Sequence, residues 1–270
     1  MSVEKALSLF SSGLASESDE LILRYLAGAT DLLFWNYLDE EGRTKVQDTL
    51  QQLLFKRMGS KAPADIKKAL YGLFTSIAYS PWGKTQLYRL WSDELKIADL
   101  KLNEDDYTRL AMLLAVYEYP GAGSILAKAR EAISNPDQLR RFDYLQPALS
   151  ADETEREQFF NSFRKSENRE KESWVITACY YIHHPLRQKS AIRYLPMSLE
   201  LLPEIAATGD IFFPKAWLDN TIGRYRSAEA YEILKKYLDT TSHLNPFLRA
   251  KLLQATDDLY RVQEILPGDY

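Results

Sequence analysis

Histidine binds metals and transfers protons near neutral pH, and this chain has three histidines. His183 and His184 are adjacent, while His243 is distant in sequence. Neighbouring residues of a helix point about 100° apart, so the two adjacent rings cannot easily share one metal ion. No Asp or Glu completes a recognisable ligand spacing, and the zinc motif His-Glu-x-x-His is absent. We expect the pair to pack and cap backbone carbonyls at a helix end before Pro185, and we expect no metal or other cofactor in this chain.

Candidates for nucleophilic or phosphate chemistry are also weak. Cys179, the single cysteine, lies in the apolar run WVITACYYI, which is typical of a core helix. There is no Gly-x-Ser-x-Gly motif. The run Gly121–Ser124 lacks the third glycine and the Lys-Ser/Thr pair of a phosphate loop, so we interpret it as a turn after Pro120. The sequence therefore predicts no catalytic residue.

One aromatic turn is more informative. In the run GDIFFPKAW, Phe212, Phe213 and Trp217 surround a proline that starts a helix. The favoured interpretation is a hydrophobic anchor between two helices. The functional interpretation is that the three rings line a concave surface that meets a peptide. Burial of all three rings would rule out the second interpretation.

The elements that position these residues are predicted to be helices. In the segment Asp19–Leu38, Ile22, Leu26, Ala29 and Leu33 recur at spacings of three and four, which predicts that they share a buried face. Similar series follow at Val46–Met58, Ile66–Ile77, Leu110–Tyr117 and Leu248–Leu259. Helix starts are predicted at Ser80-Pro81, at Asn103, at Asn245-Pro246, and at Ser150 with Glu153 as a capping box.

Short loops between such helices favour antiparallel neighbours. We therefore predict an all-α fold of irregular stacked helical hairpins, a bowl-shaped superhelix of the HEAT/armadillo kind. The segment 95–102 is the best candidate for a subdivision, but it is too apolar for a disordered linker. We expect one helical-repeat domain over residues 1–270.

Composition excludes several classes of function. The 270 residues are 46% hydrophobic and 27% charged, with a formal charge of -4. This balance indicates a soluble globular domain and disfavours binding to nucleic acid or an anionic membrane. No signal peptide or membrane-spanning run is recognisable, which leaves the compartment open.

Much of the chain, most clearly its second half, resembles the C-terminal helical domain of the zinc aminopeptidases related to aminopeptidase N. The similar segments are Pro147–Ser150, Arg156–Phe163, Asn168–Val175, His184–Arg187, Thr208–Pro214 with Trp217 and Leu218, and Leu248–Ala255. In that family, a zinc ion held by two histidines and a glutamate activates water, and a Gly-x-Met-Glu-Asn motif binds the substrate's amino terminus. These residues belong to upstream domains, and neither motif occurs here.

The resemblance implies that this chain is a non-catalytic domain that covers the active site and controls peptide access. Its partners would be an upstream catalytic domain, where the zinc is expected, and a peptide substrate; the parent would be cytoplasmic or periplasmic. The alternative is a free-standing helical-repeat scaffold that binds a protein or peptide. Arg187, Arg193 and Arg224 are candidates for attracting a peptide carboxylate, but we favour structural ion pairs or solvated helix surface as their role.

Overall fold

Helices, turns and loops account for all of residues 3–265, the part of the chain that the computed structural model describes. The predicted all-α class and the stacking of helices are confirmed. The bowl-shaped superhelix stays a prediction. The chain divides into two compact units, one ending at Ser134 and the other beginning at Asn135.

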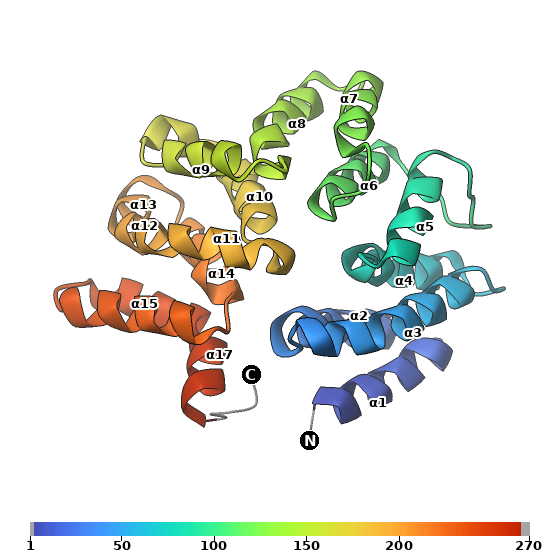
Figure 1. Ribbon diagram of the computed structural model, residues 1–270, viewed down its shortest axis with the longest axis horizontal. Coiled ribbons are helices and arrows are strands. Elements are labelled where there is room, and N and C mark those ends of the chain that lie inside the picture. Colours follow the sequence, from blue (N-terminus) through green and yellow to red (C-terminus); the bar gives the residue numbers. More distant parts are fainter. Residues whose placement is uncertain (1–2, 266–270) are drawn as a thin grey trace. The chain divides into compact units, whose positions relative to one another are not determined.

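The first unit is a stack of mostly long helices (Figure 1). They are α1 (Val3–Ser16), α2 (Glu20–Leu32) with a π-helical extension (Leu33–Tyr37), α3 (Glu40–Met58), α4 (Ala64–Ile77), α5 (Pro81–Trp91), α6 (Glu104–Val116) and α7 (Ala122–Ala132). Helix α2 packs on α1 and α4, α3 packs on α4, and α6 packs between α5 and α7. Burial confirms the apolar faces predicted for α4 and α6, because Ile66, Leu70, Leu110 and Leu114 are almost inaccessible to solvent.

The face predicted for α2 is wrong. The structure buries Leu23, Ala27, Thr30 and Phe34, a stripe rotated by one residue from the predicted one, and leaves Ile22 half exposed. The sequence of α2, ELILRYLAGATDL, is apolar on several sides, so its periodicity alone does not choose among neighbouring stripes.

The segment 95–102 lies inside the first unit, between α5 and α6. It is not helical, as expected of a linker, but the protein holds it in place. Ile97 is buried, and the buried Lys67 of α4 donates from Nζ to the carbonyl oxygen of Ala98 at 2.6 Å. The boundary between the two units instead follows α7.

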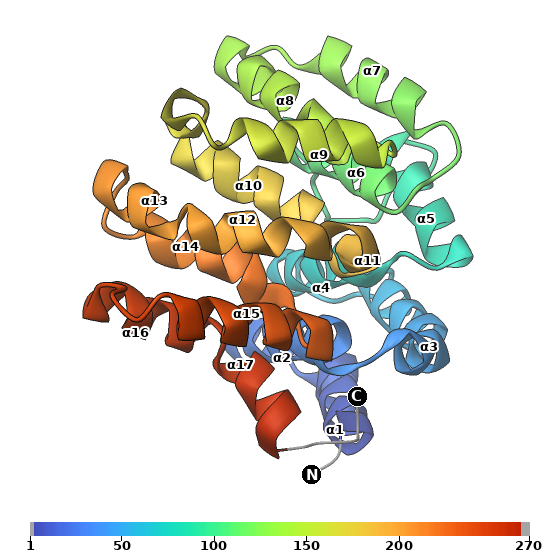
Figure 2. The ribbon, with the colours of Figure 1, turned by 60° about the vertical axis from the view of Figure 1, so that its left-hand side comes forward.

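The second unit has shorter helices joined by 3-10 turns. They are α8 (Pro136–Leu149), α9 (Glu153–Ser162), α10 (Glu172–Ile182), α11 (Gln188–Ala191), α12 (Leu195–Glu200), α13 (Leu202–Thr208), α14 (Phe213–Asn220), α15 (Ala228–Thr240), α16 (Pro246–Ala255) and α17 (Asp257–Tyr260). Helix α10 packs on α8 and α14, α12 packs on α15, and α14 packs on α16, which produces the successive layers visible in Figure 2.

Most of the predicted helix starts are confirmed. Ser80, Asn103 and Asn245 each accept a backbone N–H of the following helix, and Asn103 forms a reciprocal capping box with Asp106. The capping box predicted for Ser150 is wrong. Asp152 caps α9 by accepting from the Thr154 N–H, while the Ser150 hydroxyl accepts from the Asp152 N–H.

Candidate binding surfaces

The aromatic turn of the second unit splits between core and surface. Trp217 is fully buried, stacks on Phe160 with 5.8 Å between ring centroids, and donates from Nε1 to the Ser198 carbonyl at 2.9 Å. Phe213 is buried beside it. These two rings form the predicted hydrophobic anchor and do not face solvent. Phe212 is 76% exposed, so it alone of the three is available to a ligand.

Phe212 belongs to an exposed apolar cluster, formed by Ile211 and Phe212 in the turn before α14 and by Phe247 at the start of α16. Hydrogen bonds to side chains hold the backbone of this turn in place. Glu172 accepts the Asp210 N–H at 2.7 Å, and the Asp210 carboxylate accepts the Phe212 N–H at 2.7 Å.

Lys251 links the two parts of the cluster. Its Nζ donates to the Ile211 carbonyl at 2.9 Å and lies 4.8 Å from the centroid of the Phe247 ring. The apolar side chains are thus presented to solvent on a backbone that is already ordered, which lowers the entropic cost of binding.

The three predicted arginines have structural contacts. Arg187 is buried and donates to the carbonyls of Ala148 and Leu149 at 2.7 and 3.1 Å, where it satisfies the last turn of α8.

Arg193 lies at the surface, 3.1 Å from a carboxylate oxygen of Glu153 and 3.7 Å from one of Glu157. Arg224 lies over the Tyr180 ring, 4.6 Å from its centroid. The geometry therefore supports structural roles for Arg187 and Arg193, the interpretation that the sequence favoured.

The adjacent histidines are both buried. His183 Nδ1 lies 2.8 Å from the Tyr225 hydroxyl, and burial, reinforced by the charge of Arg224, lowers the pKa of His183 to about 3. His184 Nδ1 accepts the Leu186 N–H at 3.3 Å. This ring therefore caps the start of the next 3-10 turn, and a carbonyl-capping role for the pair stays a prediction.

Cys179 is a core residue, as predicted, and burial raises the pKa of its thiol. Gly121 adopts a left-handed backbone with φ of 79° directly before α7, in agreement with the predicted turn. Within the described residues, no group of three or more His, Cys, Asp or Glu side chains is arranged to hold a metal ion.

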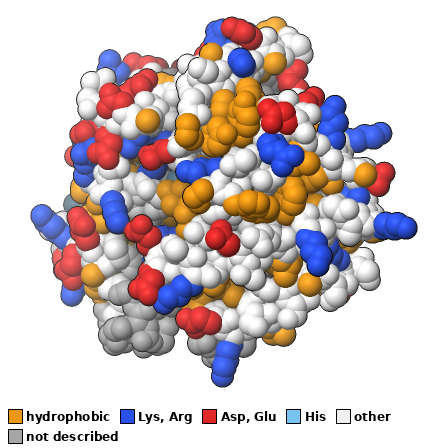
Figure 3. All heavy atoms as spheres, turned by 45° about the vertical axis from the view of Figure 1, so that its right-hand side comes forward, with side chains coloured by type: hydrophobic (Ala, Val, Ile, Leu, Met, Phe, Trp, Pro, Cys, Tyr) orange, Lys and Arg blue, Asp and Glu red, His pale blue; other side chains and the backbone are white. Residues whose placement is uncertain are grey.

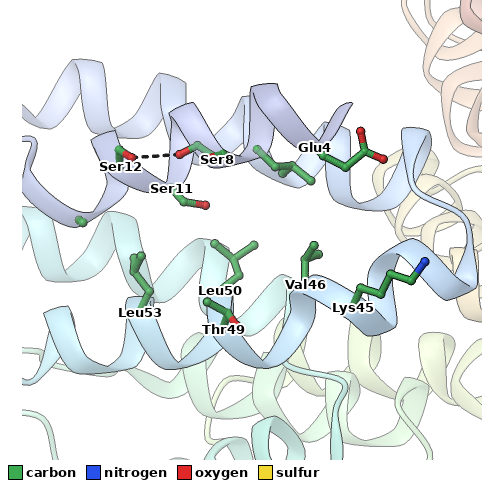
Figure 4. Close-up of a pocket in the computed structure, with 11 residues that line it drawn as sticks. Glu4, Ser8, Ser11, Ser12, Lys45, Val46, Thr49, Leu50 and Leu53 are labelled. Atoms are coloured by element: carbon green, nitrogen blue, oxygen red, sulfur yellow. Dashed lines mark hydrogen bonds between the residues drawn. The ribbon is translucent and has the colours of Figure 1, made fainter. Parts of the chain in front are cut away.

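The sequence did not reveal a groove in the first unit, between α1 and α3 (Figure 4). One hollow of about 490 Å³ is lined by residues that include Leu7, Ser11, Val46 and Leu50. A second, of about 740 Å³, adjoins it and reaches the start of α4. In the sequence, the feature that could have indicated this groove is the row of small residues on one side of α1, namely Ser8, Ser11, Ser12 and Ala15.

Helix α2 carries a second apolar surface that periodicity missed. Leu21, Tyr25 and Leu32 form an exposed row at spacings of four and seven, interrupted only by Gly28, and Leu21 and Tyr25 are 77% and 74% exposed. We call these three residues the α2 row. A row of large exposed apolar side chains on one helix is typical of a protein interaction surface.

Charge is distributed evenly where it can be seen. On the face shown in Figure 3, side chains of both charges are present, and apolar side chains gather towards the middle. The described helices include none with the length and apolar character needed to cross a membrane. The face in Figure 3 thus carries apolar contact area together with charges of both signs.

No model of a protein family matches the chain, and a search of curated proteins also finds no match.

Proposed function

We propose that this chain is the non-catalytic C-terminal domain of a zinc-dependent aminopeptidase, where it covers the active site and controls the access of peptides. The observation that carries this proposal is the exposed apolar cluster of Ile211, Phe212 and Phe247. It lies mostly within Thr208–Pro214, one of the segments that resemble the aminopeptidase domain. Exposed rings on a preordered turn are suited to contact a passing peptide.

The α2 row supports the other part of the proposal, which is docking to another domain. Covering its exposed apolar side chains with another surface is favourable, by about 25 cal/mol per Å² of apolar area buried. In an aminopeptidase, this other domain is the upstream catalytic domain that holds the zinc ion.

The second candidate is a free-standing helical-repeat scaffold that binds a protein or peptide. The same exposed cluster and the α2 row would then serve separate partners. An upstream reading frame that encodes His-Glu-x-x-His in the same gene distinguishes the two, because only the aminopeptidase needs it.

The direct test is an activity assay with aminoacyl chromogenic substrates and added zinc. We expect the purified chain to be inactive alone and to raise the activity or solubility of the separately expressed upstream segment when the two are mixed. Hydrolysis by the chain alone, after contamination is excluded, would contradict a non-catalytic role. No effect on mixing would favour the scaffold.

A peptide-length series tests the role of the exposed cluster. In the mixed enzyme, Phe212→Ala should change KM for long peptides several-fold and leave the chromogenic aminoacyl substrate unaffected, because only a long chain reaches the ring. Leu186→Ala is the matched control, since Leu186 is a half-exposed apolar residue of the same unit outside the cluster. Equal changes in KM for short and long substrates would contradict a contact between Phe212 and the peptide.

A further inference from the structure

The groove between α1 and α3 lies entirely within the first unit and is separate from the exposed cluster and the α2 row. Its two hollows share Ala15, Thr49 and Leu53, so they form one continuous depression along both helices. Each volume falls in the range of about 300–1,000 Å³ that is usual for ligand sites. The groove is therefore large enough to receive several side chains of a partner.

Both walls have the spacing of a helix–helix contact. On α3, Val46, Leu50 and Leu53 are four and three residues apart, which places them in one row. On α1, Leu7, Ser11 and Ala15 form the opposite row, in which two small residues leave the space unfilled. Figure 4 shows Ser11 on the α1 side of the groove and Leu50 on the α3 side. A third helix with apolar side chains at the same spacing fits between these rows.

Helices α1 and α3 run parallel along the groove, with their C-terminal ends at the same end. Glu4 and Lys45 line one end of the groove, while Ser16 and Lys56 line the other. Between these pairs α1 and α3 each advance about 17 Å, the length of a helix of about twelve residues. Both helices present their C-terminal, partly negative ends near Lys56, which favours the N-terminus of an added helix there.

Charge distinguishes the two ends. Glu4 and Lys45 carry opposite charges at the first end. At the second end, the charged residues that line the hollow are Lys56 and Arg57, with no carboxylate among the lining residues described. Arg57 donates to the carbonyls of Leu14 and Glu17 and stays in place, while Lys56 is exposed. Arg57 also interacts electrostatically with the carboxylate of Glu17, so the exposed Lys56 is the cation that makes this end complementary to an added carboxylate.

We propose that the groove binds an amphipathic helix of a protein partner, about three turns long, that lies antiparallel to α1 and α3 and carries acidic residues in its first turn. Apolar side chains of this helix fill the row of hollows. Its acidic first turn lies beside Lys56 and Arg57, where acidic residues also stabilise the partner's own helix. This proposal does not depend on an aminopeptidase function.

The test uses the full chain and a fluorescent synthetic peptide of about twelve residues. The peptide has leucines at spacings of three and four and three glutamates in its first turn; in the control peptide, glutamines replace the glutamates. Fluorescence anisotropy should show about fivefold tighter binding of the glutamate peptide at low salt. Lys56→Gln should remove this preference, and Lys128→Gln, which removes an exposed lysine of α7 outside the groove, should retain it.

A steric variant tests the location. Ala15 is exposed and lines both hollows, so Ala15→Arg should block the groove without unfolding the protein and weaken binding at least about tenfold. Leu9→Arg is the matched control on an exposed position of α1 outside the groove. Thermal unfolding checks that both variants fold. Equal affinity of the two peptides, unchanged affinity in Ala15→Arg, or no binding at about 1 mM peptide would overturn the proposal.

Discussion

At the scale of single residues, Trp217 holds together the core of the second unit. Its ring contacts Phe160, Phe163 and Phe213, and its Nε1 satisfies a buried carbonyl of Ser198. Trp217→Ala should lower the free energy of unfolding by about 3–5 kcal/mol, because it leaves a cavity and an unpaired carbonyl. Urea unfolding measures this loss. A cost below about 1 kcal/mol would show that the site collapses around the smaller side chain.

His183 should make stability depend on pH. Its folded-state pKa of about 3 lies below the unfolded value, so the unfolded chain binds a proton more readily between these two values. The contribution of neutral His183 to the free energy of unfolding is fully present above about pH 6.5. It falls as the pH drops towards the folded-state pKa, by up to about 1.4 kcal/mol per pH unit.

Urea unfolding between pH 7 and pH 5 tests this, with His183→Gln as the comparison because it cannot titrate. We expect the wild-type free energy of unfolding to fall more steeply with decreasing pH than that of the variant. Parallel curves would mean that buried His183 does not titrate differently in the two states.

Cys179 should be unreactive in the folded protein. Burial excludes reagents and raises the pKa of the thiol, so little thiolate is present at neutral pH. A colorimetric thiol reagent should modify it only after denaturant unfolds the second unit. Rapid modification of the native protein would indicate frequent local opening around α10.

At the scale of elements, α2 shows how a helix with several apolar sides is oriented by its neighbours. Leu23 faces the core, whereas the adjacent Ile22 is half exposed. Leu23→Ala should therefore cost about 2–5 kcal/mol of unfolding free energy, and Ile22→Ala less than about 1 kcal/mol. Thermal or urea unfolding of the two variants compares the two faces directly. A larger cost for Ile22→Ala would support the face that periodicity predicted.

Most helix starts could be predicted from the sequence. A cap requires only a short polar side chain beside the first helical turn, and Ser80, Asn103 and Asn245 meet that condition in the sequence. At the start of α9, the predicted cap was Ser150, and the structure uses Asp152 instead. Because both are good capping residues, the choice depended on where the last turn of α8 ends, which Arg187 helps to fix.

At the scale of the whole molecule, the charge is mildly negative and mixed. The formal charge is -4, and the face in Figure 3 carries both acidic and basic side chains. We expect no binding to duplex DNA at about 0.1 M salt, because binding requires several phosphates to be neutralised together. A mobility-shift assay with the full chain measures this, and a salt-dependent shift would reveal a basic surface on another face.

The sequence by itself determined the helical class, most helix starts and the core position of Cys179, since these depend on local spacing and capping. Tertiary structure decided which stripe of α2 is buried, that Phe213 and Trp217 are in the core while Phe212 is exposed, and that small residues of α1 leave a groove beside α3. The physical reason is that spacing defines which residues share a face. Only the shapes and distances of neighbouring helices determine whether that face is filled, covered or left open.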